Sequence, residues 1–316
     1  MENQNINSLP LEQEQFAAPV DAVAQASGKT PEQQNEDLIM RAKISRKIIA
    51  EAIAAGNLCC TPGADGHVDT SRASNPKTGT NYKGQSLLLL KQHAKNNGFS
   101  TAEYVSGEQI DFINSYMSVP FAEKLKIKKG SKGVTINYLK EVDNPDGTKV
   151  QVPENLRLFN VAQLENTKVL TDFMTVRKHE QQEFVKAQLA EEGKGFKPRS
   201  SSQEKGEAIV CSSTVPQEYL GQYFAAVSTG ADFVVTPEQA AAFGKAFNDA
   251  LYQKNEQGKI NPFNLNVICS QASKNCVELL KSKAQEKKQE KENPAKEKQP
   301  PKPKQNIDME YDGMSM

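Results

Sequence analysis

A lysine-rich segment contains the residues that point most directly to chemistry. Five lysines fall within nine residues, which creates a local positive field although the formal net charge of the chain is zero. Apolar and polar residues alternate over 125–139, which predicts a strand, a glycine turn and a second strand. This β-hairpin could contact sugar–phosphate, or its lysines could protect a sheet edge from aggregation. The segment contains Lys124, Lys126, Lys128, Lys129 and Lys132, with Gly130 and Gly133 in the turn.

The loop at residues 74–84 is the second candidate. Its proline and two glycines predict a tight turn, because proline fixes φ and glycine accepts a positive φ. The glycines are expected to shape the loop, while two cations and one aromatic ring could contact phosphates and unstacked bases. The residues concerned are Pro76, Gly79, Gly84, Lys77, Lys83 and Tyr82. Tyr104 and Tyr138 are further stacking candidates, with core packing as the alternative for each.

Motifs of several enzyme classes are absent from the sequence. GxxxxGK[ST], GxGxxG and GxSxG do not occur, so the loops of nucleotide hydrolysis, dinucleotide binding and serine nucleophiles are missing. His179-Glu-Gln-Gln-Glu183 is close to a zinc-binding HExxH helix, but Glu183 stands where the second histidine belongs. A solvated helix face is the preferred interpretation of this segment, because no pattern indicates a third ligand. We therefore expect no catalytic residue, no metal site and no cofactor.

Composition limits the compartment and the class of protein. Hydrophobic residues make up 37% of the chain and the mean hydropathy is −0.64, so part of the chain is expected not to fold. No apolar run approaches the roughly 20 residues of a membrane-spanning helix, so no membrane partner is expected. An odd number of cysteines without CxxC predicts reduced thiols in a cytoplasmic protein. These cysteines are Cys59, Cys60, Cys211, Cys269 and Cys276.

The pattern along the chain predicts an α+β fold in which N-terminal helices pack on a small antiparallel sheet, followed by a mainly helical region. Helical spacing, caps and stop glycines predict helices over 37–55, 85–96, 106–117 and 171–192, and a short helix after the capping-box pattern Ser100–Glu103. Thr236-Pro-Glu-Gln239 predicts another helix start. Further strands are expected at 150–152 and 156–161.

Five regions follow from these elements. A disordered N-terminal segment is expected at 1–36 and an α+β domain at 37–170. A charged helix with a mobile loop follows at 171–206, and a mainly helical second unit at 207–281. A disordered Lys/Glu/Pro tail with an acidic tip is expected at 282–316.

Four segments resemble the N-terminal domain of ArdC-like antirestriction proteins, which is shared with TraC-type plasmid primases. In chain order they are Asn75–Gly84, Tyr104–Gln109, Ile127–Gly133 and Arg157–Gln163, and the resemblance covers about residues 37–170. It implies sequence-independent binding of single-stranded DNA. Tyr104 stands where tryptophan is common, Ser131 replaces a glutamate, and Gln85-Ser86 replaces a hydrophobic–Asn pair. Because HExxH is missing, the metallopeptidase role of full-length relatives is not transferred to this chain.

The function expected from the sequence is single-stranded DNA binding by a mobile-element, plasmid or phage protein, in antirestriction, transfer or replication. The expected DNA contacts are Lys77, Tyr82, Lys83, Tyr104, Lys126, Lys128, Lys129, Lys132 and Tyr138. One alternative is an inhibitor that binds a host restriction nuclease directly. Another is a divergent zinc metallopeptidase that uses His179. The acidic tip could recruit replication, transfer or restriction proteins, or it could be a free end.

Overall fold

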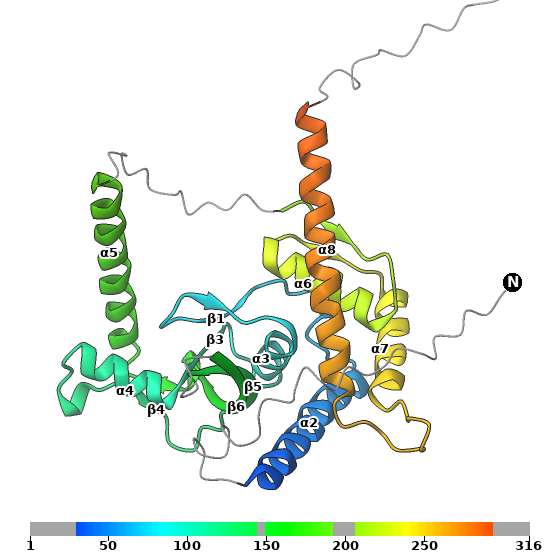
Figure 1. The fold of residues 1–316 in the computed structure, drawn as a ribbon, viewed down its shortest axis with the longest axis horizontal. Coiled ribbons are helices and arrows are strands. Elements are labelled where there is room, and N and C mark those ends of the chain that lie inside the picture. The colour runs from blue at the N-terminus through cyan, green and yellow to red at the C-terminus, as the bar shows by residue number, and fades with distance from the viewer. Residues whose placement is uncertain (1–29, 144–148, 192–205, 293–316) are drawn as a thin grey trace, which may run out of the picture.

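The computed structural model describes residues 30–143, 149–191 and 206–292 of the 316-residue chain. The fold is α+β, as the sequence predicts. Figure 1 shows the helices α4 and α5 at one end of the molecule and α6, α7 and α8 at the other, with the sheet and α3 between them.

A five-stranded sheet forms the middle of the fold, in the order β2-β1-β3-β6-β5. Its pairs are antiparallel except for β1 and β3, which run parallel, so the sheet is mixed rather than purely antiparallel. The two segments expected as separate strands at 150–152 and 156–161 belong to one long strand, β6. The strands are β1 (Ala73–Asn75), β2 (Thr80–Asn81), β3 (Ala102–Ser106), β5 (Val134–Asp143) and β6 (Lys149–Asn160).

The predicted lysine hairpin is wrong. The first strand of the expected hairpin is β4 (Lys126–Ile127), and it pairs antiparallel with β7 (Leu164–Glu165) instead of with β5. Strand β5 pairs along its whole length with β6. A period-two pattern identifies strands but not their partners, which depend on contacts distant in sequence.

Helices cover the sheet and begin where the sequence places caps. The capping box at Thr236/Gln239 starts one of them, as predicted. The helix expected over 106–117 starts with a capping box at Ser106/Gln109, which the sequence analysis does not name. A third capping box, Thr30/Gln33, starts the first helix at Pro31, six residues before the expected position. The larger helices are α2 (Pro31–Ala54), α3 (Gly84–Asn96), α4 (Gly107–Tyr116), α5 (Lys168–Glu191), α6 (Pro216–Thr229), α7 (Pro237–Leu251) and α8 (Asn264–Glu292).

Two further expectations need correction. The segment after Ser100 is not a short helix but strand β3, which is buried between β1 and β6. Helix α8 continues to Glu292, so the expected tail does not begin at 282. The rest of that tail and the N-terminal segment up to residue 29 lie outside the described residues. Short elements complete the fold: η2 (Phe121–Glu123), η3 (Val161–Gln163), β8 (Ile209–Val210) and β9 (Phe233–Val234).

Two hydrophobic cores hold these elements together. The larger core joins α2, α3 and the sheet to α6, α7 and α8, so the helices of the C-terminal half share the core of the N-terminal half. The smaller core fixes α4 and α5 to the sheet through Val105, Ile110, Ile113, Leu125, Phe159, Leu164, Leu170 and Phe173. All five cysteines are free and buried. Within the described ranges, no helix combines the length and apolar character needed to span a bilayer.

The contact between α6 and α8 depends on the absence of a side chain at Gly221. A Cβ added there would lie 2.8 Å from the Asn275 Cβ and 3.1 Å from the Ala272 carbonyl oxygen. We expect Gly221→Ala to lower the free energy of unfolding by about 1–2 kcal/mol, because overpacking outweighs the gain in helix propensity. Urea denaturation measures this change.

Gly107→Ala is the matched control. Gly107 is the first residue of α4, and a Cβ there would meet no atom within 4 Å. This variant should be as stable as the wild type or more stable by up to about 1 kcal/mol. Equal stability of the two variants would contradict the close α6–α8 packing.

Candidate nucleic-acid interface

The turn between β1 and β2 is held by the buried side chain of Asn75. The Oδ1 atom accepts hydrogen bonds from the backbone N–H groups of Lys77 (3.0 Å) and Thr78 (3.4 Å). The Nδ2 atom donates to Gln109 Oε1 at 3.1 Å, which ties the turn to the first turn of α4. Gly79 closes the turn with φ 68°, as the sequence predicts for a turn glycine.

The two lysines of this loop lie in different surroundings. The Lys77 Nζ atom lies 3.8 Å from the centroid of the Phe112 ring on α4. Lys83 is exposed and precedes the first residue of α3. The adjacent Gly84 has φ 54° and approaches α8, where a Cβ would lie 3.0 Å from the Ser273 Oγ atom. Gly84 therefore shapes the loop and packs against the protein itself.

The predicted stacking tyrosines are mostly structural. Tyr104 is fully buried, and its hydroxyl donates to the Leu90 carbonyl oxygen at 3.0 Å, so the prediction that it stacks on bases is wrong. Tyr82 is half-buried against the larger core, and burial raises the pKa of its hydroxyl to about 12. Tyr138 lies in β5, and its side chain is outside the described residues.

The basic segment, residues 124–132, is attached to α4 by hydrogen bonds near its first residue. The buried Asn114 side chain donates to the Leu125 carbonyl oxygen (2.9 Å) and accepts from the Leu125 N–H (2.8 Å). The neighbouring lysines lie around the exposed ring of Phe121, with Lys126 Nζ at 4.9 Å and Lys124 Nζ at 5.8 Å from its centroid. A cation beside an exposed ring provides both a phosphate contact and a stacking face.

The second half of the basic segment is fixed by Gln163. Its carbonyl oxygen accepts from the Lys128 N–H at 2.8 Å, and its Nε2 atom donates to the Lys132 carbonyl oxygen at 3.1 Å. Its Oε1 atom accepts from the Asn160 N–H at 2.9 Å. The segment turns at Gly130, which has φ 84°. The backbone is therefore ordered while Lys129 and Lys132 are exposed.

Close packing leaves no space for a side chain at Gly133, the residue that follows the basic segment. A Cβ at Gly133 would lie 2.6 Å from the Leu158 carbonyl oxygen and 3.0 Å from the Phe159 ring, so only glycine fits there. The Lys128 Nζ atom donates to the Ala162 carbonyl oxygen at 2.8 Å. The ion pairs found within the described ranges involve no lysine of the basic segment.

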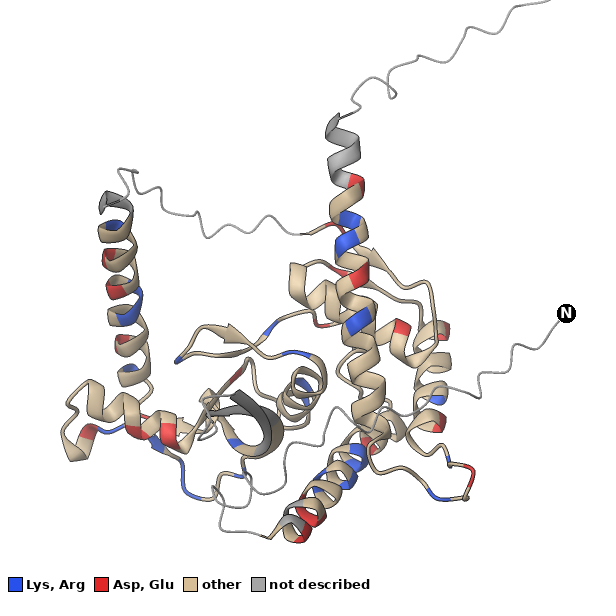
Figure 2. Cartoon of the chain, in the orientation of Figure 1, with Lys and Arg blue, Asp and Glu red and all other residues tan. Residues whose placement is uncertain are grey.

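Three exposed aromatic residues beside these cations are not predicted by the sequence reasoning. Phe112, Tyr116 and Phe121 are 46%, 40% and 79% exposed. The signal that identifies the first two is their spacing: they lie four residues apart on α4, off the face that Ile110 and Ile113 bury. Figure 2 shows Lys and Arg residues at the β1–β2 turn and along the chain between α4 and β5.

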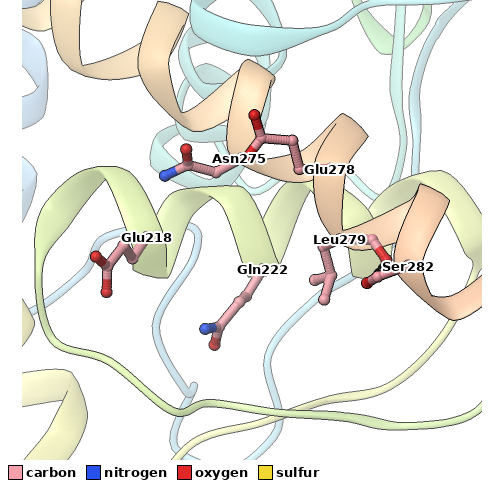
Figure 3. A pocket seen from close by; sticks show the side chains of 6 residues that line it. All are labelled: Glu218, Gln222, Asn275, Glu278, Leu279 and Ser282. Carbon is pink, nitrogen blue, oxygen red and sulfur yellow. Dashed lines mark hydrogen bonds between the residues drawn. The ribbon is translucent and has the colours of Figure 1, made fainter.

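The hollows found in the described part of the molecule do not suit nucleic acid. An open groove of about 450 Å³ between α6 and α8 contains two carboxylates, Glu218 and Glu278, which would repel phosphates (Figure 3). A smaller pocket of about 170 Å³ contains Lys91. The Lys91 Nζ atom already donates to oxygens of Asp69 and Ser71, at 2.7–3.1 Å.

The HExxH-like segment lies on the exposed surface of α5. Glu180 accepts hydrogen bonds from the Tyr116 hydroxyl and from Arg177, which lower the pKa of the carboxyl group. Glu183 pairs with Lys186 at 2.7 Å. Within residues 30–143, 149–191 and 206–292, no group of three or more His, Cys, Asp or Glu side chains is placed to hold a metal ion.

Residues 39–184 match the family described as the N-terminal domain of anti-restriction factor ArdC. Two crystal structures of the antirestriction protein ArdC from plasmid R388 are similar to this chain. The metal-free structure has a TM-score of 0.45 and 12% identity and covers 77% of this chain and 98% of its own. The Mn(II)-bound structure has a TM-score of 0.45 and 14% identity, with 76% and 97% covered. No match was found among curated proteins.

The role of Asn114 can be tested by removing its amide. Asn114→Ala leaves the Leu125 N–H and C=O buried without partners, so the free energy of unfolding should fall by about 2 kcal/mol or more. Trypsin should also cleave faster at Lys124 and Lys126, because the segment is released from α4. Urea denaturation and timed proteolysis measure the two effects.

Ser115→Ala serves as the control, since Ser115 is the next residue on α4 and is exposed. Its stability should stay within about 0.5 kcal/mol of the wild type. If Asn114→Ala behaved like this control, the proposed attachment of the basic segment to α4 would be wrong.

Proposed function

We propose that this chain, whose residues 39–184 are an ArdC-like N-terminal domain, binds single-stranded DNA without sequence preference and acts in antirestriction. The observation that carries the proposal is the convergence of two cation-bearing segments on α4. Lys77 reaches α4 from the β1–β2 turn, and the basic segment is attached to α4 near its start, where Leu125 is hydrogen-bonded to Asn114.

Phosphate contacts provide the affinity in this proposal. Lys129 and Lys132 are exposed on a backbone that Gln163 fixes, so their ammonium groups can reach phosphates without a large rearrangement of the chain. Lysine is a compact point charge without a preferred planar partner, which suits phosphates better than base edges. Contacts of this kind hold any sequence equally well.

Exposed aromatic rings favour a single strand over a duplex. The bases of a single strand offer open faces to stack on a ring such as Phe121, whereas the bases of a duplex are already stacked on each other. Occupancy by the protein would then protect the strand from host nucleases. This function requires no chemical step and no cofactor.

The salt dependence of binding tests the proposal. The wild type should bind a labelled single-stranded oligonucleotide with an affinity that falls steeply as salt rises. Each lost phosphate contact on a single strand flattens the slope of log K against log salt by about 0.7. The triple variant Lys126→Ala/Lys128→Ala/Lys129→Ala should therefore flatten the slope by up to about 2, measured by fluorescence anisotropy across a salt series.

A second triple variant, the control, removes the same number of positive charges from a part of the protein outside the candidate surface. Lys245→Ala/Lys254→Ala/Lys259→Ala changes exposed lysines on α7 and in the loop that follows it, and should keep the wild-type slope. Absence of wild-type binding at low salt would overturn the proposal. Protection of DNA from a restriction nuclease without DNA binding would instead identify an inhibitor that binds the nuclease.

A further inference from the structure

We propose that Phe112 and Tyr116 form an aromatic platform on α4 on which the bases of a single-stranded nucleic acid stack. The choice of ligand rests on the proposed function, but the platform itself is built from contacts outside the basic segment. Stacking on the platform would make the affinity depend on the presence of bases, whereas the lysines make it depend only on the phosphates.

The two rings are supported from below. Their centroids lie 5.9 Å apart with an interplanar angle of 22°, so the rings are nearly parallel. Both rings meet Phe173 edge-on, at 6.3 Å for Phe112 and 5.5 Å for Tyr116. Phe173 is 1% exposed and belongs to the smaller core, whereas the platform rings are 46% and 40% exposed. An apolar surface is thus presented to solvent on a rigid base.

Helix α5 holds the Tyr116 ring in place. The Tyr116 hydroxyl donates a hydrogen bond to Glu180, and Arg177 Nη1 donates to the same carboxylate at 3.0 Å. A ring that is ordered before binding loses less conformational entropy when a base stacks on it. The guanidinium group beside Glu180 also offsets the negative charge that would otherwise repel a nearby phosphate.

A cation stands beside the other ring. The Lys77 Nζ atom lies 3.8 Å from the Phe112 centroid, over its face. This position shows that the ring attracts a positive group, and the same ammonium group can pair with a phosphate while a base takes its place on the ring. Backbone bonds from Asn75 fix the turn that carries Lys77, so the cation stays near the platform.

Charge and continuity favour nucleic acid over other occupants. The platform has the cation of Lys77 on one side, whereas on the other side Glu180 balances the charge of Arg177. The charge of Lys77 favours a polyanion over an apolar helix. The platform continues through Asn114 to the basic segment and the exposed ring of Phe121. A stable contact with a second copy of this chain would bury about 800 Å² of surface on each partner in typical complexes, which is more than two half-exposed rings provide.

A tryptophan reporter tests the platform directly, because the chain contains no tryptophan. In Tyr116→Trp, the single indole should be quenched when an oligo-dT strand binds, and quenched much less by an abasic strand of equal length and charge. Tyr252→Trp is the control. Tyr252 is 39% exposed, close to the 40% of Tyr116, and has the Arg46 guanidinium 5.1 Å from its ring. The fluorescence of this variant should not change with either strand.

Truncation of the rings measures their contribution. Phe112→Ala/Tyr116→Ala should weaken binding to oligo-dT by about 10- to 100-fold, leave binding to the abasic strand unchanged, and keep the salt slope. Tyr116→Phe keeps the ring and loses only the hydroxyl, so its affinity should stay within a few-fold of the wild type. Circular dichroism establishes that each variant is folded.

The outcomes separate this inference from the proposed function. If neither strand binds at any salt, the proposed function fails and the platform fails with it. If both strands bind equally with a steep salt slope, or Tyr116→Trp is not quenched by bound oligo-dT, DNA binding survives and the platform is overturned. A change of oligomeric state in the double alanine variant, seen by sedimentation, would assign the rings to a protein interface and also overturn it.

Discussion

The hydrogen bond between the side-chain amides of Asn75 and Gln109 is the interaction on which the candidate surface depends. Asn75 ends strand β1 and Gln109 lies in the first turn of α4, where backbone groups lack partners, and the buried amide of Asn75 must itself be satisfied. Asn75 meets that need by closing the β1–β2 turn, while Gln109 completes the cap of α4. The turn that carries Lys77 is therefore attached to the helix that carries Phe112.

The same physical device recurs at the two other attachments of the surface. Asn114 binds both backbone groups of Leu125, and Gln163 binds the backbone on both sides of the Gly130 turn. In each case a side-chain amide holds the backbone of a polar loop. Burial of Leu125 in the smaller core and the bond from the Lys128 N–H to the main-chain carbonyl of Gln163 add to this attachment. Lysine side chains on such a loop stay exposed, because the backbone is ordered without burying them.

In the segments that resemble the family, several of the matching residues support the structure instead of forming the exposed surface. Three of their members fix the backbone, namely Asn75 and Gln163, which are buried, and Gln109, which is half-buried. Tyr104 belongs to the core. The cations and exposed rings lie between or beside them. The C-terminal helices contribute to the same scaffold, because α8 packs against α3 at Gly84 and shares the larger core. The candidate surface lies within residues 39–184, which match the family, but helices outside that range help to support it.

The sequence by itself determined the features that are set by local chemistry. The capping box at Thr236 placed the start of α7, and the helical spacing of Ile110 and Ile113 placed α4. Gly56, Gly79 and Gly98 took the positive φ that ends a helix or closes a turn. The lysine-rich segment was also evident, because charge density needs no partner to be recognised. Each of these properties is decided within a few residues.

Only the tertiary structure decided which strand pairs with which and which rings are buried. Strand β4 pairs with β7 rather than β5 because Gln163 and Gly133 bring distant backbones together. Tyr104 is buried whereas Phe112 and Tyr116 are exposed, although all three are aromatic residues within thirteen positions of each other. Burial depends on the neighbours that pack around a residue, and those neighbours are supplied by long-range contacts that a local pattern does not encode.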